Sequence, residues 1–450
     1  MSLIYTILIF ILTISIIVTF HEYGHYIAAR LCGVKVLEFS VGFGRKIFGK
    51  KIGKDQTEYK VCVLPLGGYV KMLDEREGEV DNHEKNRAFN NQSLLKKSFI
   101  VFSGPLFNFI LAIFFYFLVF IGGYEGFKPI VGVVENNSIA ENIKIKEDDI
   151  ILSINNTEVK TWSDVTLQLV KFSSEEKNIF FEVMRNNNKV KLNHIDYQKI
   201  HLDNQNILEN LGIYNFISKT IKIGYIEEDS PAYNSGLLKG DKIISAKGIK
   251  VKNWKDIVNI IKINPEKEIV LKIKRKNDIK LVKVIPKSIK INNKEFGRLG
   301  ISPLIEEQDI LKNKINIKYE LIDSIKLSFL KTYDFTILTF NFIFKLIKGE
   351  VSSSSISGPV GIAGYAADSF NSGYSSFLGL LAMLSISIGI LNLLPIPMLD
   401  GGHLMYYLIE FIIRRPVPER VQLIFQQVGV TFLIMLSFFA LYNDLLRIMK

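Results

Sequence analysis

Two histidines and a glutamate near the N-terminus have the spacing of a metal site. His21, Glu22 and His25 lie in the sequence His-Glu-Tyr-Gly-His. Residues four apart on a helix share a face, so both imidazoles can bind one metal ion. Glu22 lies one residue further round, where it can act as a general base towards a metal-bound water without being a ligand. The pattern predicts a hydrolytic zinc site, because zinc is the usual metal of such motifs.

The position of this motif in an apolar segment strengthens the metal prediction. The run from Leu3 to Ala29 is long enough to cross a bilayer. It lacks the basic start and the small-residue cleavage site of a signal peptide, so we interpret it as a retained span. Three ionisable groups inside a membrane are costly unless something compensates them. One metal ion would compensate all three.

A catalytic zinc ion usually has three protein ligands, so one more ligand is expected elsewhere in the chain. Asp400 is the first candidate, and we expect it on another transmembrane helix. Two alternatives stay open, namely that His403 is the ligand, or that Asp400 is a solvated residue of a loop that ends a helix. The remaining histidines lie in polar or external segments and are weaker candidates: His83, His194 and His201.

The segment around Asp400 contains helix breakers. Pro395 and Pro397 are expected to end the preceding apolar helix, and Gly401 and Gly402 to permit a tight turn. Irregular backbone at membrane depth is tolerated only where protein buries it or water reaches it. An active-site cavity meets that condition.

The composition fits a membrane protein with polar domains. Hydrophobic residues make up 48% of the 450 residues and charged residues 22%, and the mean hydropathy is +0.21. The formal net charge of +11 is diffuse and no basic cluster is interleaved with aromatic residues, so we expect no nucleic-acid partner. Four segments are expected to span the membrane: Leu3–Ala29, Phe99–Gly122, Phe377–Leu394 and Val428–Tyr442.

One further apolar segment is ambiguous. Leu327–Ile347 is aromatic-rich but is interrupted by Lys331, Asp334 and Lys345, so we interpret it as an amphipathic helix on the membrane surface. If it crossed the membrane instead, Asp400 would lie on the opposite side from the histidines. The basic segment from Arg30 to Lys97 indicates a cytoplasmic loop. The N-terminus and the long region after the second span are then outside.

The long external region contains an internal repeat. A fixed offset separates equivalent residues, which predicts two copies of one small domain. The first copy contains Ser138, Ala140, Asp149, Ile151, Ser153, Val159, Trp162 and Asp164, and the second Ser230, Ala232, Asp241, Ile243, Ser245, Val251, Trp254 and Asp256.

The second copy reads Ser-Pro-Ala-x-x-Ser-Gly-Leu-x-x-Gly-Asp-x-Ile and resembles the PDZ domain. PDZ domains bind extended peptides or chain ends by adding a strand to a sheet edge. In the first copy Lys144 and Asp148 stand where the second has Gly236 and Gly240. Two interpretations stay open, namely that the domains bind peptides or that they only restrict access to the site.

On these motifs the whole chain resembles the site-2 protease family of intramembrane zinc metalloproteases, and more narrowly the bacterial regulator of sigma-E protease type with two PDZ domains. The resemblance implies that His21, His25 and Asp400 bind Zn²⁺ and that Glu22 activates water. It also assigns to Asn392, in the motif Asn-x-x-Pro-x-Pro-x-x-Asp-Gly, a part in holding the substrate strand. Three further residues match a Gly-Pro-x-x-Asn motif on the second span: Gly104, Pro105 and Asn108.

The resemblance also implies a membrane-re-entrant β-hairpin in the cytoplasmic loop. The segment Glu58–Met72 alternates loosely and contains Pro65, Gly67 and Gly68. An exposed strand edge can hold an unwound substrate in extended form. Together with Pro395 and Pro397, Gly67 and Gly68 are therefore candidate substrate-binding residues. An ordinary surface hairpin is the alternative.

The predicted fold is a multi-span α-helical membrane protein with four transmembrane helices, a re-entrant β-hairpin and two external α+β PDZ domains. The expected parts are the first two spans (1–124), PDZ domain 1 (125–220), PDZ domain 2 (221–310), a linker with the surface helix (311–375) and the last two spans (376–450). By resemblance the protein lies in the bacterial inner membrane, with both termini and the PDZ domains periplasmic and the active site near the cytoplasmic side.

The predicted function is hydrolysis of a peptide bond in or near the transmembrane segment of single-span membrane proteins. By resemblance the substrate is an anti-sigma factor of the envelope stress response, and remnant signal peptides are a second class. A non-catalytic PDZ scaffold with a structural metal is the main alternative, but a structural site needs no general base such as Glu22. A metal transporter would need more ligands along a path than this one cluster provides.

Overall fold

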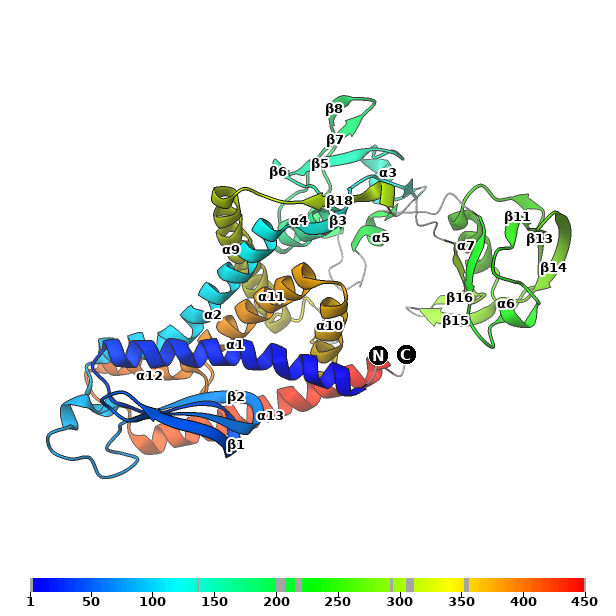
Figure 1. The fold of residues 1–450 in the computed structure, drawn as a ribbon. Coiled ribbons are helices and arrows are strands. Elements are labelled where there is room, and N and C mark those ends of the chain that lie inside the picture. The colour runs from blue at the N-terminus through cyan, green and yellow to red at the C-terminus, as the bar shows by residue number, and fades with distance from the viewer. Residues whose placement is uncertain are drawn as a thin grey trace. The chain divides into compact units, whose positions relative to one another are not determined.

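The computed structural model describes residues 3–135, 137–199, 207–214, 221–291, 294–304, 311–351 and 356–448. By its internal contacts the chain divides into two compact units (Figure 1). The first unit comprises Met1–Tyr124 and Asn316–Lys450, and the second comprises Glu125–Ile315. The first unit contains the long helices and a β-hairpin, and the second contains most of the strands.

Four helices among the described residues are long and apolar enough to cross a membrane, as the sequence predicts. The helices that contain them are α1 (Leu3–Leu31), α2 (Leu94–Gly122), α11 (Tyr374–Leu393) and α13 (Glu419–Ile448). α2 begins before the predicted Phe99 because Ser93 caps it and accepts a hydrogen bond from the Lys96 amide. Hydropathy therefore predicts the apolar part of a helix that can lie in the bilayer, but not where the helix itself begins.

Three shorter or less apolar helices complete the first unit: α9 (Leu321–Ile347), α10 (Pro359–Asn371) and α12 (Asp400–Ile413). α9 is not among the candidate spans. It packs on α2 and α11, with Leu327, Phe335 and Ile343 against their apolar core, and its buried residues are the small Ser324, Ser328 and Thr332. Such residues let two helix backbones approach closely.

α2 lies between α1 and α11 in the core of the first unit. Buried apolar residues from all three helices, including Ile17, Leu111 and Ile386, form one cluster. α1 and α2 meet at Gly24, where a Cβ atom would lie 2.4 Å from the Ser103 carbonyl oxygen. The glycine of the His-Glu-Tyr-Gly-His motif thus permits the contact that brings α2 next to the histidines.

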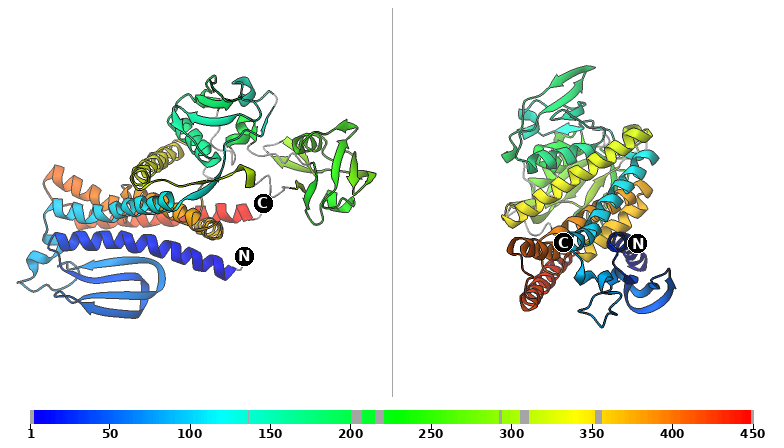
Figure 2. Two further views of the ribbon diagram at one scale, coloured as in Figure 1. Left: turned by 45° about the horizontal axis from the view of Figure 1, so that its top comes forward. Right: turned by 90° about the vertical axis from the view of Figure 1, so that its left-hand side faces the viewer.

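The hairpin of the first unit consists of two long, bent strands, β1 (Val36–Ile52) and β2 (Thr57–Met72), which lie alongside α1 (Figure 2). Phe39 of β1 pairs with both Tyr59 and Val70 of β2, so the start of β1 lies between the two ends of β2. Residues 68–72 pair only with β1 among the described residues and form an outer edge. Ser15, within α1, donates a hydrogen bond of 2.7 Å to the Pro65 carbonyl.

The second unit contains two four-stranded antiparallel sheets with the same strand order, each beside a helix. The first sheet has the order β6-β5-β7-β8 and the second β12-β11-β13-β14. Their strands are β5 (Ile150–Ile154), β6 (Thr157–Glu158), β7 (Phe181–Arg185), β8 (Asn188–Lys191), β11 (Lys242–Ala246), β12 (Ile249–Lys250), β13 (Ile269–Arg275) and β14 (Asp278–Val284). Each copy has its own buried core.

The remaining elements are short. The helices are α3 (Ile139–Asn142), α4 (Trp162–Ser174), α5 (Ile207–Leu211), α6 (Pro231–Asn234) and α7 (Trp254–Lys262), with 3₁₀ turns at Lys85–Arg87, Phe89–Asn91 and Tyr197–Lys199. The strands form two-stranded sheets: β4 (Val133–Val134) with β9 (Ile213–Tyr214), β10 (Ile223–Ile226) with β17 (Ile301–Pro303), β15 (Lys287–Ile291) with β16 (Lys294–Arg298), and β3 (Tyr124–Phe127) with β18 (Lys314–Ile317).

The residues that recur in the sequence are those that hold each copy together. Asp149 is buried and accepts hydrogen bonds of 2.8 and 2.7 Å from Arg185. Asp241 is likewise buried and accepts two bonds of 2.8 Å from Arg275. In both copies the arginine also donates to the carbonyl of the positive-φ residue, which is Lys144 in the first copy. The repeat is thus one fold built twice.

Candidate active site

The histidines and Asp400 come from two helices that are far apart in the sequence. His21 and His25 lie one turn apart on α1, and Asp400 is the first residue of α12. α12 is a separate helix of 14 residues, so the structure places Asp400 beyond the end of the candidate span in α11 rather than on it. The loop of residues 394–399 separates it from α11.

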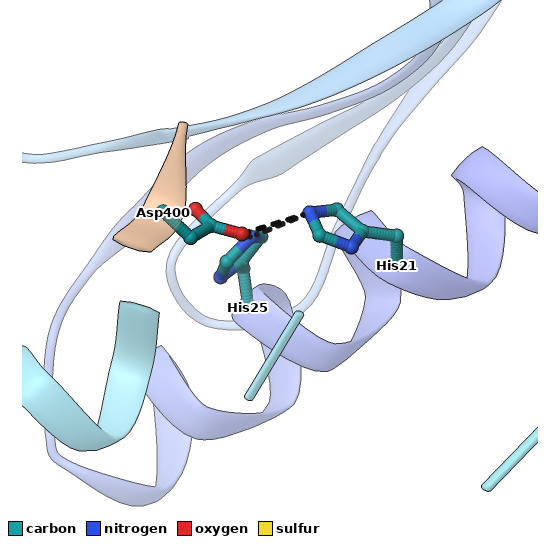
Figure 3. Close-up of side chains that lie close together, drawn as sticks. All are labelled: His21, His25 and Asp400. Carbon is teal, nitrogen blue, oxygen red and sulfur yellow. Dashed lines mark hydrogen bonds and ion pairs between the residues drawn. The ribbon is translucent and has the colours of Figure 1, made fainter. Parts of the chain in front are cut away.

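Three potential ligand atoms converge on one point (Figure 3). Asp400 Oδ2 lies 3.1 Å from His21 Nε2 and 3.5 Å from His25 Nε2, and the two nitrogens are 3.2 Å apart. Ligands bound tetrahedrally to zinc at about 2.0–2.1 Å are about 3.3–3.4 Å from one another. Asp400 Oδ2 is buried and has no hydrogen-bond donor near it among the described residues apart from these imidazoles. The donor set and its spacing fit a zinc ion.

The far side of each imidazole contacts a group that can orient the ring. His25 Nδ1 lies 2.9 Å from the Ile100 carbonyl oxygen, which can only accept, so Nδ1 carries the hydrogen and the Nε2 lone pair faces the cluster. His21 Nδ1 lies 3.2 Å from Asn108 Nδ2, the amide nitrogen. A hydrogen on His21 Nδ1 requires the amide oxygen in that place, and turning the amide over would also give Asn108 Oδ1, which is buried without a hydrogen-bond partner, a donor. Asn108 therefore suits the orientation of His21.

A glycine of α2 makes room for both imidazoles. A Cβ atom on Gly104 would lie 2.3 Å from His25 Nε2 and 2.8 Å from His21 Cε1. α11 supports this part of α2, since Ser385 Oγ donates a hydrogen bond of 2.8 Å to the Asn108 carbonyl. The sequence had indicated Gly104, Pro105 and Asn108 only as a motif, without these contacts.

A cavity of about 330 Å³ opens beside the three ligand atoms. Glu22, His25 and Asp400 line it together with the edge of β2, and its further lining residues are Val70, Lys71, Met72, Asp74, Arg76, Glu77, Phe89, Ile100, Val101 and His403. Burial raises the pKa of Asp74, but hydrogen bonds from Arg76 outweigh this and hold the pKa below its usual value. Asp74 is therefore ionised at neutral pH.

The two glycines of β2, Gly67 and Gly68, are places of close approach. A Cβ atom on Gly68 would lie 2.7 Å from the Ser40 carbonyl oxygen and 3.1 Å from Glu22 Cγ. A Cβ on Gly67 would lie 2.1 Å from the ring of Phe43. The β2 edge and the carboxylate of Glu22 are thus neighbours.

The other predicted substrate-binding residues lie outside the cavity lining. Asn392 is in the last turn of α11, and Pro395 and Pro397 are in the loop that follows. Their roles remain predictions.

The expectation of a tight turn at Gly401 and Gly402 was wrong, because both are helical residues in the first turn of α12. Cβ atoms there would lie 2.2 Å from the Leu394 carbonyl oxygen and 2.5 Å from that of Ile396. These glycines are needed because the start of α12 packs closely against the backbone of the preceding loop, and not because they adopt a special φ angle.

Comparison with known proteins identifies the kind of site. The model of Peptidase family M50 matches residues 9–436. The chain belongs to peptidase family M50. The regulator of sigma-E protease RseP of Escherichia coli is 36% identical over 446 residues, which cover 98% of each chain. The regulator of sigma E protease of Haemophilus influenzae is 35% identical over 456 residues, which cover all of both chains.

A further relative, from Vibrio cholerae, carries the name "Putative zinc metalloprotease" and is 34% identical over 444 residues, 98% of each chain. This M50 peptidase is accordingly a zinc-dependent metalloendopeptidase. Its apolar helices and its relatives make it an inner-membrane protein.

Proposed function

We propose that this peptidase cleaves single-span membrane proteins in or near their transmembrane segments, at a zinc ion bound by His21, His25 and Asp400. The observation that carries the proposal is the convergence of the three ligand atoms at tetrahedral spacing, beside Glu22 and a cavity. The histidines belong to a helix that is apolar enough to span a membrane. The reaction centre is therefore expected within the bilayer.

The chain's own residues divide the work of hydrolysis. Zinc, when bound, supplies a Lewis acid that polarises water and the scissile carbonyl. Glu22 removes a proton from water as the water oxygen bonds to the carbonyl carbon, and it gives that proton to the amide nitrogen as the C–N bond breaks. The products are a carboxylate and an amine. The contacts of Ile100 and Asn108 keep the imidazoles turned towards the metal.

The β2 edge suits a substrate that has been unwound. A transmembrane helix hides its peptide bonds in its own hydrogen bonds, so a segment must become extended before it can be hydrolysed. Residues 68–72 could pair with it as an added strand next to Glu22, with Gly67 and Gly68 allowing close approach. The Ser15–Pro65 hydrogen bond lies within the apolar part of α1 and supports a hairpin that re-enters the membrane.

The substrates follow from the relatives. Two of them are named regulators of sigma-E, so we assign this peptidase to a stress response that a sigma factor controls. Its substrate class would be a single-span anti-sigma factor already cut outside the membrane, with remnant signal peptides as a second class. Asn392, Pro395 and Pro397 would help hold the substrate near Asp400.

The proposed orientation places the metal site near the cytoplasmic side. Basic residues are concentrated between Arg30 and Lys97, so this loop is cytoplasmic and the N-terminus is periplasmic. With α9 lying on the membrane surface, α11 runs inwards and delivers Asp400 to the side of the histidines. α13 then returns the C-terminus to the periplasm.

We assign the two copies of the second unit to PDZ domains, at 125–220 and 221–310, followed by a linker at 311–375. The repeated strand order and the repeated Asp–Arg pair support one common fold. The second copy has a cavity of about 460 Å³ along α7 and the strands β16 and β17, which suits a peptide or chain end. A filter that admits only substrates with trimmed external domains would need no such binding.

The Glu22→Gln variant tests the function. The amide keeps the size of the side chain but cannot accept the proton from water. We expect zinc content equal to that of the wild type and cleavage of a labelled single-span substrate slower by about 10²–10⁴-fold. Metal analysis and cleavage are measured on the same purified samples.

The matched control is Glu77→Gln, which neutralises another carboxylate that lines the same cavity. It should cleave at close to the wild-type rate. Equal cleavage by wild type and Glu22→Gln would exclude hydrolysis at this site.

A further inference from the structure

The cavity beside the zinc ligands contains one histidine that the mechanism above does not use. His403 follows Asp400 on α12 by three residues, so the two side chains lie on the same face of the helix. His403 lines the cavity together with Glu22, His25 and Asp400. It is not part of the group of ligand atoms that lie within 4.8 Å of one another. It therefore faces the reaction space without being positioned as a ligand.

A hydrogen-bond donor in that space would assist peptide hydrolysis in addition to the metal. When water adds to the scissile carbonyl, negative charge develops on the carbonyl oxygen. Glu22 accepts a proton at this stage and cannot stabilise that charge. A donor fixed in advance and screened from bulk water is worth more than one that solvent surrounds.

Three side chains of the cavity wall that are not zinc ligands could donate: Lys71, Arg76 and His403. Lys71 is 43% exposed, and Arg76 is 55% exposed and held by Asp74 through contacts of 2.9 and 2.6 Å. Their exposure places both cations towards solvent. The His403 side chain is only partly exposed, and no hydrogen bond joins its imidazole to another described residue.

The backbone that carries His403 is held firmly next to the metal site. Gly401 and Gly402 pack against the carbonyls of Leu394 and Ile396, which fixes the first turn of α12. The ring of Tyr406 lies edge-on to that of His403, with centroids 6.3 Å apart. An imidazole on such a turn loses little freedom when it binds a substrate oxygen.

We propose that His403 donates a ring N–H to the oxyanion of the tetrahedral intermediate and is thus a further catalytic residue of this peptidase. The inference rests on the proposed function and adds a role at the same site. Both the neutral and the charged imidazole carry an N–H, so the role does not depend on the protonation state of His403.

The test compares catalysis with binding of a transition-state analogue. A peptide phosphinate imitates the tetrahedral intermediate, whereas the substrate does not. For His403→Ala we expect unchanged zinc content, a KM within about twofold of the wild type, and a kcat lower by about 10²–10³-fold. The phosphinate should bind more weakly by the same factor as kcat/KM falls. His403→Gln, which retains an N–H donor, should recover part of both, and His83→Ala, in a loop outside the cavity, should change neither.

The other outcomes are decisive as well. Loss of zinc from His403→Ala, or a fall in kcat without weaker phosphinate binding, would overturn the role of His403 while leaving the peptidase assignment intact. A failure of the proposed function would look different, because the wild type itself would not bind the phosphinate and Glu22→Gln would cleave as fast as the wild type.

Discussion

At the scale of single residues, the site depends on small side chains as much as on its ligands. His21 and His25 can turn both Nε2 atoms towards Asp400 only because Gly104 has no side chain between them. Asn108 and the Ile100 carbonyl then hold the opposite ring nitrogens. The ligands and the helix that packs on them thus form one unit.

Gly104→Ala tests this dependence. The added methyl group would lie 2.3 Å from His25 Nε2, so an imidazole must move. We expect zinc affinity to fall by about 10–100-fold, as when groups that orient metal ligands are lost, and cleavage to fall with it. Titration with a zinc chelator measures the affinity.

Gly379→Ala is the matched control, because a Cβ atom there has no neighbour within 4 Å. It adds the same methyl group to α11 and should leave zinc affinity unchanged. An equal zinc affinity in Gly104→Ala and the wild type would refute the packing argument.

The sequence predicts the metal ligands better than the residues that pack against them and orient them. The spacing of His21, Glu22 and His25 predicts a metal site because residues within about one helical turn share a face. Asp400 is recognisable as an acidic residue next to helix-breaking prolines. The contacts of Gly104 and Asn108 depend on how α2 packs across α1, which no local pattern encodes. His403 was considered only as a ligand, because its distance from the cluster could not be known without the fold.

At the scale of elements, apolar runs and repeats predict much of the architecture, but boundaries and strand courses less well. Four spans were expected and four helices fit them. α9 begins at Leu321, before the predicted Leu327, because polar residues near its start continue the helix. The hairpin consists of β1 as well as β2, and the start of β1 pairs with both ends of β2. The alternation of apolar and polar residues in Glu58–Met72 could not predict this double pairing.

The repeated domains show how one backbone tolerates different residues. Lys144 and Asp148 adopt φ angles of 69° and 63°, and their glycine counterparts Gly236 and Gly240 adopt 75° and 92°. A left-handed conformation strains residues that have a Cβ atom. The first copy therefore keeps the turn of the second copy at some cost in stability.

Lys144→Gly should remove this strain. The Lys144 side chain is exposed, and its carbonyl contact with Arg185 survives the change. We expect the first copy to become more stable against local opening by about 1 kcal/mol, measured by hydrogen exchange of α3 and β5 in the full-length protein.

The reciprocal variant Gly236→Lys should weaken the second copy by a similar amount. Faster exchange in Lys144→Gly than in the wild type would mean that its side chain, rather than the turn, stabilises the first copy.

At the scale of the whole molecule, the metal site combines two ligands from near the N-terminus with a third ligand, Asp400, from near the C-terminus. α1 and α12 come from distant parts of the sequence, and α2 packs on both of them. The parity of the spans decides whether such a meeting is possible, because an extra crossing before α11 would separate Asp400 from the histidines. The proximity of the three ligand atoms is therefore also an argument about topology.

X-ray absorption at the zinc edge of the purified protein tests the central claim most directly. We predict two imidazole nitrogens and one carboxylate oxygen at about 2.0–2.2 Å, with zinc lost or the carboxylate missing in Asp400→Ala and an unchanged ligand set in His403→Ala. A spectrum with a third imidazole or a sulfur ligand at about 2.3 Å, or one that Asp400→Ala leaves unaltered, would contradict the account.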